Sequence, residues 1–238
     1  MLVARDAKRL TRFERTSTYF YPNGTPIKAG NVLKNLSYAK TLRAIASDKG
    51  RSFYQGEIAK DIVDTVQSAA DNPGRLDLHD LAGYHVKERL AVCVTYRELD
   101  VCGMGPPSSG GITVGQILGM LASYDLAKMG PNSPDAWRLI GDASRLAFAD
   151  RGRYIADNDF VSVPIKGLLN KKYLKNRATL LNRKKALETV SPGNPPFHIA
   201  HSFADDESIE LPSTTHISII DQYGNALSMT ATIENAFG

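Results

Sequence analysis

The sequence predicts an α/β chain, in which several helices are combined with a few short strands. Two observations support this fold class. Six stretches repeat apolar residues at the spacing of a helix face, and two shorter stretches alternate β-branched and polar residues around a turn signal. The length of 238 residues suits one or two domains, and 42% hydrophobic and 23% charged residues are ordinary values for a globular protein.

The helical stretches have recognisable ends. Gly50 ends the second stretch and the triplet 72–74, Asn-Pro-Gly, ends the third. Ser133 followed by Pro134 is a typical N-cap and first position for the fifth. The six predicted helices span residues 1–16, 36–49, 55–70, 112–126, 133–148 and 170–182.

Four of these helices have an apolar face that we expect to point inward. Two turns are also predicted, one at residues 22–24 and a short capped turn at residues 80–84. The expected inward residues are Leu2, Leu10 and Phe13; Leu36, Ala39, Leu42, Ile45 and Ala46; Ile58, Ile62 and Val66; and Trp137, Ile140, Ala143, Ser144 and Ala147.

Residues 90–96 and 99–105 form the first predicted hairpin. A two-residue loop at Arg97-Glu98 would place Cys93 opposite Cys102. Two cysteines so placed can form a disulfide in an oxidising compartment, and the alternative is a pair of buried thiols. Arg-Glu is unfavourable chemistry for a tight hairpin turn, so the sequence leaves both the register and the redox state open.

Residues 214–238 contain the second predicted hairpin and are the most informative part of the chain. If the loop is 222–224, with Gly224 at the left-handed position, Thr214 lies opposite Thr232. One face then carries small and polar side chains and the other is apolar, whereas a slip of one residue would mix the two faces. The polar face consists of Thr214, His216, Ser218, Ile220, Ala226, Ser228, Thr230 and Thr232, and the apolar face of Ile217, Ile219, Leu227 and Met229.

Directly opposed threonines can form a hydroxyl hydrogen bond, but two interpretations remain open. The hairpin is either an ordinary half-exposed element rich in threonine or part of a catalytic site. His216 lies two residues from Thr214 on the polar face, where a structural hydrogen-bonding role is favoured over one in tuning a site.

Several ordered sequence blocks resemble the γ-glutamyltransferase (glutathione hydrolase) family. The resemblance covers nearly the whole chain, and the order and spacing of the blocks make it specific. The matching blocks are Gly24–Gly30, Phe53–Ala59, Asp80–Tyr84, Pro106–Gly111, Ala149–Arg151, Asp157–Phe160, Ser213–His216, Asp221, Gly224-Asn225, Thr230–Thr232 and Phe237-Gly238.

The resemblance implies an N-terminal-nucleophile hydrolase, whose fold is a four-layer α-β-β-α sandwich with helical additions. Such enzymes are synthesised as one inactive chain that cuts itself before a threonine. The matching bond is Ser213–Thr214, so residues 1–213 would be the C-terminal part of the large subunit and residues 214–238 the start of the small one. The two subunits would stay associated after the cut.

The same resemblance assigns roles to three residues. Thr214 is the expected nucleophile, with the α-amine released by cleavage as its base, since that amine has a pKa near neutrality. Thr232 matches the threonine whose hydroxyl bonds the nucleophile. Glu234 matches the position that holds the substrate's α-amino group, where a carboxylate suits an ammonium, and the alternative is a solvated carboxylate at a strand end.

The implied activity is γ-glutamyl transfer and hydrolysis, with a γ-glutamyl donor such as glutathione and an amino acid, a peptide or water as acceptor. The alternatives are an amidase for glutaryl or cephalosporin-type acyl groups and a non-catalytic fragment or assembly subunit. By comparison with the family, the substrate-clamping arginine lies upstream of Met1 and the oxyanion-hole segments lie downstream of Gly238. We therefore expect these 238 residues alone to be inactive.

Other functions lack support in the sequence. The glycine-rich segment 105–111 has neither the Walker nor the dinucleotide spacing, the triplet 157–159 is not closed by a glutamate as a calcium loop would be, and the five histidines show no metal spacing. No cofactor is implied. The net charge of +4 is dispersed, so a nucleic-acid partner is not expected, and no apolar run reaches membrane-spanning length.

The family resemblance also bears on the cellular compartment and on the segment that precedes the scissile bond. Residues 1–13 lack the apolar core of a signal peptide, and bacterial relatives imply a signal upstream and a periplasmic or extracellular enzyme. Residues 192–213 are rich in proline, glycine and aspartate, so we expect a mobile, polar loop before the scissile bond.

Overall fold

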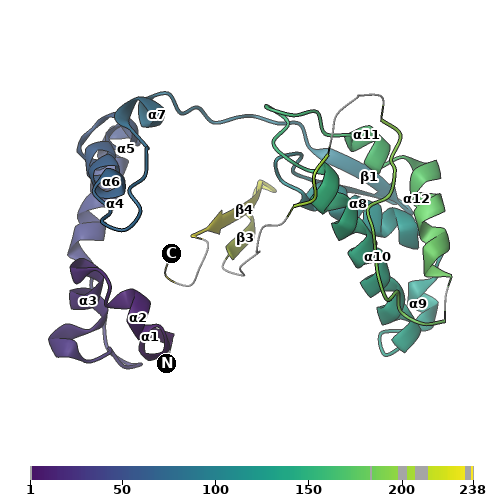
Figure 1. Cartoon of the computed structure of the whole chain (residues 1–238), viewed down its shortest axis with the longest axis horizontal. Helices are drawn as coiled ribbons and strands as arrows, with labels where there is room; N and C mark the ends of the chain where they lie inside the picture. The colour runs from purple at the N-terminus through teal and green to yellow at the C-terminus, as the bar shows by residue number, and fades with distance from the viewer. Residues whose placement is uncertain (1, 183, 198–202, 207–213, 234–236, 238) are drawn as a thin grey trace. The chain divides into compact units, whose positions relative to one another are not determined.

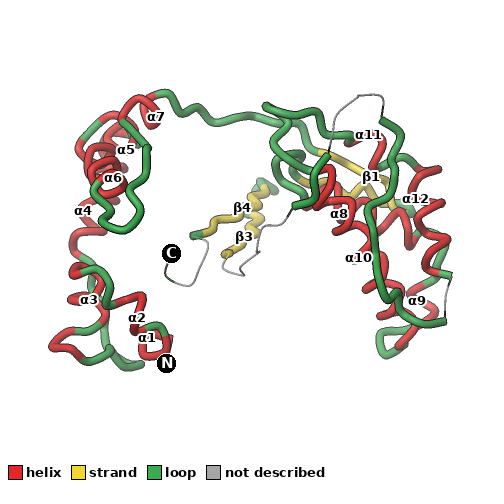
Figure 2. The backbone as a smooth tube through the Cα atoms, viewed as in Figure 1, coloured by secondary structure: helices red, strands yellow, loops and turns green. Residues whose placement is uncertain are grey.

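The structure is a computed structural model, and it describes residues 2–182, 184–197, 203–206, 214–233 and 237. The chain divides into two compact units, the first formed by Met1–Val86 with Leu211–Gly238 and the second by Lys87–Glu210. Helices predominate in both units, and each unit contains one two-stranded antiparallel sheet (Figures 1 and 2). The mixed α+β fold class is therefore confirmed.

The first unit begins with a helix that is broken rather than continuous. Residues 1–16 were expected to form one helix, but α1 (Leu2–Arg5), α2 (Ala7–Leu10) and α3 (Glu14–Phe20) are separate. The hydroxyl and the backbone N–H of Thr11 both donate to the Ala7 carbonyl, and Phe13 is extended, which ends α2. Leu10 is buried as expected, whereas Leu2 and Phe13 are exposed.

Four further helices complete the helical part of this unit, after the expected turn at η1 (Pro22–Gly24). They are α4 (Leu36–Asp48), α5 (Arg51–Gln55), α6 (Glu57–Gln67) and α7 (Leu78–Ala82). Gly56 separates α5 from α6, because its extended backbone, with a φ of −125° and a ψ of −157°, continues neither helix. A Cβ there would lie 2.8 Å from the Ser52 Cα. In α6 the expected face is confirmed: Ile58, Ile62 and Val66 are partly buried beside the buried Ala59 and Val63.

The end of α4 at Gly50 was predicted correctly, whereas the capped turn expected at residues 80–84 is a helix that begins two residues earlier. Helix α4 ends at Lys49 and Gly50, which are both left-handed, and Asp77 and Asp80 form a capping box at α7. The expected inward face of α4 is confirmed only in part, since Ala39 and Ile45 are partly buried, whereas Leu36, Leu42 and Ala46 are exposed. No residue of this helix is fully buried.

The second unit is built on three helices that enclose its core. They are α8 (Gly110–Leu121), α10 (Pro134–Tyr154) and α12 (Lys171–Ala178), with the shorter α9 (Leu126–Met129), α11 (Ile165–Leu168) and η2 (Thr179–Leu181) beside them. Ser133 caps α10 as predicted, with its hydroxyl 3.2 Å from the Ala136 N. The helix runs six residues past its predicted end at Phe148. The core consists of Met120, Leu121, Leu139, Ala143, Leu146, Ala147, Tyr173, Leu174, Leu181 and Leu187.

One predicted core residue of α10 is on the surface. Trp137 is 63% exposed, and its indole N–H donates to the Pro131 carbonyl, 2.7 Å away. Ala143 and Ala147 are fully buried as expected. The other buried positions of this helix include two carboxylates, Asp142 and Asp150, which the apolar pattern did not predict.

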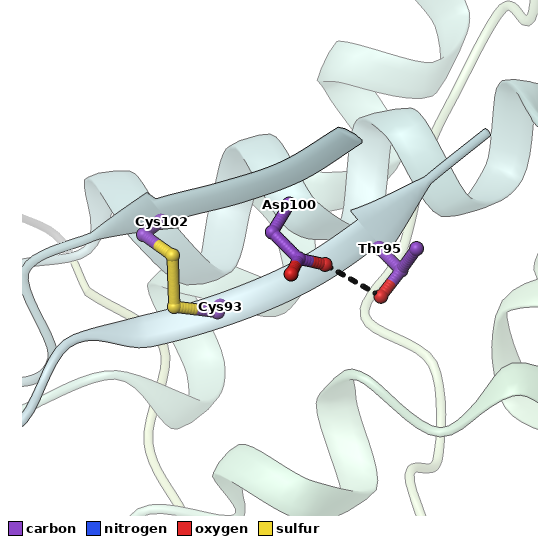
Figure 3. Close-up of a disulfide and its surroundings, with 4 residues drawn as sticks. All are labelled: Cys93, Thr95, Asp100 and Cys102. Atoms are coloured by element: carbon purple, nitrogen blue, oxygen red, sulfur yellow. Dashed lines mark hydrogen bonds between the residues drawn. A yellow bond between two sulfur atoms is a disulfide. The ribbon is translucent and has the colours of Figure 1, made fainter. Parts of the chain in front are cut away.

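The first hairpin, β1 (Val92–Tyr96) and β2 (Leu99–Gly103), has the predicted register, with Cys93 opposite Cys102. Arg97 adopts a φ of 57°, so the two-residue turn forms although Arg-Glu is unfavourable there. The cysteines form a disulfide on the exposed face of the hairpin, beside the hydrogen bond between Thr95 and Asp100 (Figure 3). The alternative of two buried thiols is therefore wrong.

Candidate active site

The second hairpin, β3 (Thr214–Ile220) and β4 (Ala226–Thr232), is organised by its turn. One carboxylate oxygen of Asp221 accepts hydrogen bonds from the backbone N–H groups of Tyr223 and Asn225, at 2.8 and 2.9 Å, and the other accepts from the Asn225 side chain at 2.8 Å. The Asn225 side-chain bond is the main reason that the pKa of Asp221 lies below its usual value. Gly224 has a φ of 84°, as the predicted loop requires.

This turn fixes the register that the sequence predicted. Thr214 pairs with Thr232, His216 with Thr230 and Ser218 with Ser228. The polar side chains therefore share one face, because alternate residues of a strand point to the same side. Ile217, Ile219, Leu227 and Met229 occupy the other face and are also exposed, since the described part of this sheet contains two strands.

His216 connects the polar side chains of the two strands. Its Nδ1 lies 2.7 Å from the Thr230 hydroxyl, and its Nε2 lies 3.1 Å from the hydroxyls of both Ser218 and Ser228. These contacts agree with the structural hydrogen-bonding role favoured for this histidine. They hold the imidazole along the strands and on the face that carries Thr214.

The structure thus brings two of the four predicted site residues together. Thr214 and Thr232 are cross-strand partners at the open end of the hairpin, opposite to the turn. Ser213 and Glu234 lie outside the described residues. The roles assigned to all four residues remain predictions, because pairing in a strand register places two hydroxyls without demonstrating any chemistry.

Sequence reasoning missed a second polar centre, which lies in the other unit. Asp150 is 1% exposed and accepts hydrogen bonds from Gln116, Tyr173, Arg177 and the backbone N–H of Gly193, at 2.8, 2.6, 3.2 and 2.7 Å. The block 149–151 had been matched to the family without a role. A signal was present, because residues 142, 146 and 150 follow one another at helical spacing along the apolar face of α10.

The described residues contain neither a cluster of metal ligands nor a membrane-spanning helix. In the described part of the chain, no group of three or more histidine, cysteine, aspartate or glutamate side chains could hold a metal ion. No helix among the described residues is long and apolar enough to cross a membrane. The polar contacts described on this face of the hairpin are made by hydroxyl groups and an imidazole.

Comparisons with known proteins identify the family. The profile of the gamma-glutamyltranspeptidase family matches residues 1–238. The chain is 37% identical to a glutathione hydrolase proenzyme of Escherichia coli K12 over 231 residues, which are 96% of this chain and 37% of the relative. It is 32% identical to an acylase ACY 1 proenzyme of Pseudomonas sp. strain SE83 over 236 residues, which are 99% of this chain and 39% of the relative.

The solved structures agree with the sequence matches. The γ-glutamyltranspeptidase of Helicobacter pylori superposes with a TM-score of 0.74 at 31% identity, over 81% of this chain and 55% of that one. The chain spans less than two fifths of the length of the two curated relatives named above. Because the family profile matches every residue and the fold matches a solved member, the chain belongs to the γ-glutamyltranspeptidase family.

Proposed function

We propose that this chain is the part of a γ-glutamyl transferase and hydrolase that carries the nucleophile, and that the nucleophile is Thr214. The observation that carries the proposal is the register that pairs Thr214 with Thr232 on the polar face of a hairpin. The family match and the word proenzyme in the relatives' names support activation by cleavage. The bond to be cut is Ser213–Thr214.

The proposed cycle has two steps. The Thr214 hydroxyl attacks the γ-carbonyl carbon of a γ-glutamyl donor such as glutathione, and the hydroxyl proton passes to the Thr214 α-amine. The C–N bond then breaks, and the leaving amine takes up that proton. Water, or the amine of an amino acid or peptide, attacks the resulting ester, which releases glutamate or the transferred product and restores the hydroxyl.

Thr214→Ala in the complete proenzyme tests this proposal. We expect one uncleaved polypeptide and no release of glutamate, whereas Thr214→Ser, which keeps a hydroxyl, should still be cut and retain partial activity. Mass spectrometry of the purified protein measures the cleavage. Two pieces from the Thr214→Ala variant would refute the assignment, and one intact mass for the wild type would favour the non-catalytic alternative.

An acylase for glutaryl or cephalosporin-type groups is the second candidate, because the Pseudomonas acylase proenzyme is 32% identical to this chain. Glu234 favours the first candidate, since a carboxylate suits a substrate that carries an α-ammonium group. The mature enzyme should therefore prefer a γ-glutamyl amide to the matched glutaryl amide. Glu234→Gln should reduce that preference mainly through KM, and an enzyme that prefers the glutaryl amide would support the acylase.

We also propose a periplasmic or extracellular location. The Cys93–Cys102 disulfide supports it, because disulfides persist in oxidising compartments and are rare in reducing ones. The two subunits formed by the cut, with residues 1–213 in one and 214–238 at the start of the other, would remain associated. These assignments rest on the same family resemblance as the activity.

A further inference from the structure

A cavity of about 690 Å³ lies in the second unit, between α10, the end of α12 and the chain segment that follows them. All of its lining residues belong to that unit. Leu146, Leu180 and Val190 give it an apolar side, and charged and hydroxyl side chains form the rest. Cavities of this size that combine apolar walls with a few polar groups commonly bind small organic molecules.

One wall of the cavity is a segment whose backbone is fixed at both ends. At its start the Leu187 N–H donates to the buried carboxylate of Asp142 at 3.1 Å. Just past its end the Gly193 N–H donates to the buried carboxylate of Asp150 at 2.7 Å. The mobile loop expected over residues 192–213 is therefore held at its start, and this wall of the cavity is preformed.

Arg177 of α12 lines the cavity with a guanidinium group that is held in place. The residue is 9% exposed, and its Nη2 donates to the carbonyls of Leu146 and Ser191 and to the Asp150 carboxylate, at 3.1, 3.0 and 3.2 Å. Its Nε is buried and has no hydrogen-bond partner among the described residues. A buried donor without an acceptor is costly, and an oxyanion bound beside this group would supply one.

Positive charge is concentrated around the same cavity. Residues 160–187 contain eight lysines and arginines and no aspartate or glutamate, whereas acidic residues outnumber basic ones in the rest of the chain. Lys184 and Lys185 line the cavity and are exposed, and neither has an ion-pair partner in the described part of the chain. Among the described lining residues Glu188 is the one carboxylate, so the lining carries more positive than negative charge.

We propose that this cavity binds an organic phosphate monoester, with the phosphate on Arg177, Lys184 and Lys185 and the organic part against the apolar side. A phosphate monoester carries about two negative charges and three acceptor oxygens at pH 7, so it can engage all three cationic groups. A carboxylate has one charge and two oxygens and would leave at least one of them without a partner. The hydroxyls of Thr189 and Ser191 also line the cavity and can donate to the same oxygens.

Isothermal titration calorimetry of the complete proenzyme tests the ligand class. Phenyl phosphate should bind at one site per chain and more tightly than inorganic phosphate, which lacks an apolar part. It should bind about tenfold more tightly than benzoate, which loses at least one charge-assisted hydrogen bond. Benzoate that binds as tightly as phenyl phosphate would overturn the phosphate assignment, and a wild type that does not bind phenyl phosphate would overturn the site.

Two pairs of lysines test where the ligand binds. Lys184→Gln combined with Lys185→Gln should weaken the binding of phenyl phosphate about tenfold, because two charged partners are lost. Lys171→Gln combined with Lys172→Gln is the matched control, since these lysines are exposed on α12 and do not line the cavity. Equal weakening by the two pairs would mean that the anion meets a diffuse basic surface, and the proposed site would be wrong.

A substitution that fills the cavity gives a test that keeps every charge. Ala186 lines the cavity and is exposed, so Ala186→Phe should abolish the binding of phenyl phosphate without disturbing the core. Ala122→Phe is the matched control, because Ala122 is an exposed residue of the same unit outside the lining. Wild-type affinity in the Ala186→Phe variant would show that the ligand binds elsewhere.

The inference goes beyond the proposed function and does not rest on it. The Thr214→Ala proenzyme should bind phenyl phosphate with wild-type affinity, and loss of binding in this variant would place the ligand at the nucleophile and overturn the inference. If Thr214→Ala blocks self-cleavage but the titrations fail, the phosphate site is wrong and the nucleophile assignment stands. If Thr214→Ala is still cut and the titrations succeed, the reverse holds.

Discussion

At the scale of single residues, Asp150 shows how this chain tolerates a buried charge. Its carboxylate accepts four hydrogen bonds, from two side chains of α12, one of α8 and the backbone N–H of Gly193. A buried carboxylate is costly unless such donors surround it, and removing one donor leaves the remaining charge poorly compensated. The same group therefore joins two helices and the backbone at Gly193 to α10.

Tyr173→Phe tests this centre through pH. Burial, and then the hydrogen bond to Asp150, raise the pKa of Tyr173 above its usual value near 10. The folded state therefore keeps the Tyr173 hydroxyl proton at pH values at which the unfolded chain has lost it. The contribution of this group to stability is complete below pH 10 and is lost as the pH rises further, by about 1.4 kcal/mol per unit.

We expect the variant to be about 1–2 kcal/mol less stable than the wild type at pH 7, because a buried hydrogen-bond donor is lost. Between pH 10 and pH 11 the difference should shrink, since the variant lacks the titrating group. Urea unfolding of the wild type and the variant at pH 7, 10 and 11 measures the difference in stability. Tyr223→Phe, on an exposed ring, is the control. A difference that stays constant with pH would contradict the assignment.

At the scale of elements, the hairpins were the most predictable part of the structure. Both registers follow from alternation and turn position, because a one-residue slip would exchange the faces of a strand. The end signals Gly50 and Ser133 are local as well and were also correct. The hydrogen bond from the Leu187 N–H to Asp142 was not predictable, since the two residues are 45 positions apart and nothing near either one specifies the other.

The predicted apolar face of a helix was buried only where another part of the chain packs against it. The pattern of α6 matched its burial, whereas the face that the pattern of α4 indicated is only partly covered, at Ala39 and Ile45. Periodicity shows which side of a helix is apolar but does not identify its partner. For the candidate site, the pairing of Thr214 with Thr232 was predicted from register alone, and the three hydrogen bonds of His216 required the side-chain geometry.

Two glycines give a matched test of backbone conformation at this scale. A Cβ at Gly224 or at Gly141 would meet no atom within 4 Å, so neither substitution creates a clash. Gly224 has a φ of 84° in the β3–β4 turn, whereas Gly141 lies inside α10. Gly224→Ala should therefore destabilise the hairpin by about 1 kcal/mol, and Gly141→Ala should stabilise its unit by roughly 0.5–1 kcal/mol.

Thermal unfolding of the Gly141→Ala variant measures the stabilisation of its unit. The cleavage rate of the complete proenzyme that carries Gly224→Ala reports on the hairpin. Gly224→Asn serves as the control, because asparagine tolerates the left-handed region better than alanine does. It should behave more like the wild type than Gly224→Ala does. Equal behaviour of the alanine and asparagine variants would mean that the positive φ does not set the stability of this turn.

At the scale of the whole molecule, the two units differ in how much of their helical surface is buried. The second unit has a continuous core between α8, α10 and α12. In the first unit the buried apolar side chains among the described residues are Leu10, Tyr21, Ala59 and Val63. Because burial of apolar surface is the main source of stability, the two units should open at different free energies.

Helices α4 and α8 offer a direct comparison, because they have 13 and 12 residues and differ mainly in burial. Helix α8 buries six residues, whereas α4 buries none. An isolated helix of this length is marginal in water, so amide hydrogens of α4 should exchange by local opening and those of α8 through opening of the core. Hydrogen exchange of the 238-residue polypeptide, followed by mass spectrometry, should show α8 amides exchanging at least about a hundredfold more slowly. Equal protection of the two helices would mean that α4 is stabilised to the same extent as the core, which its exposed Leu36 and Leu42 do not explain.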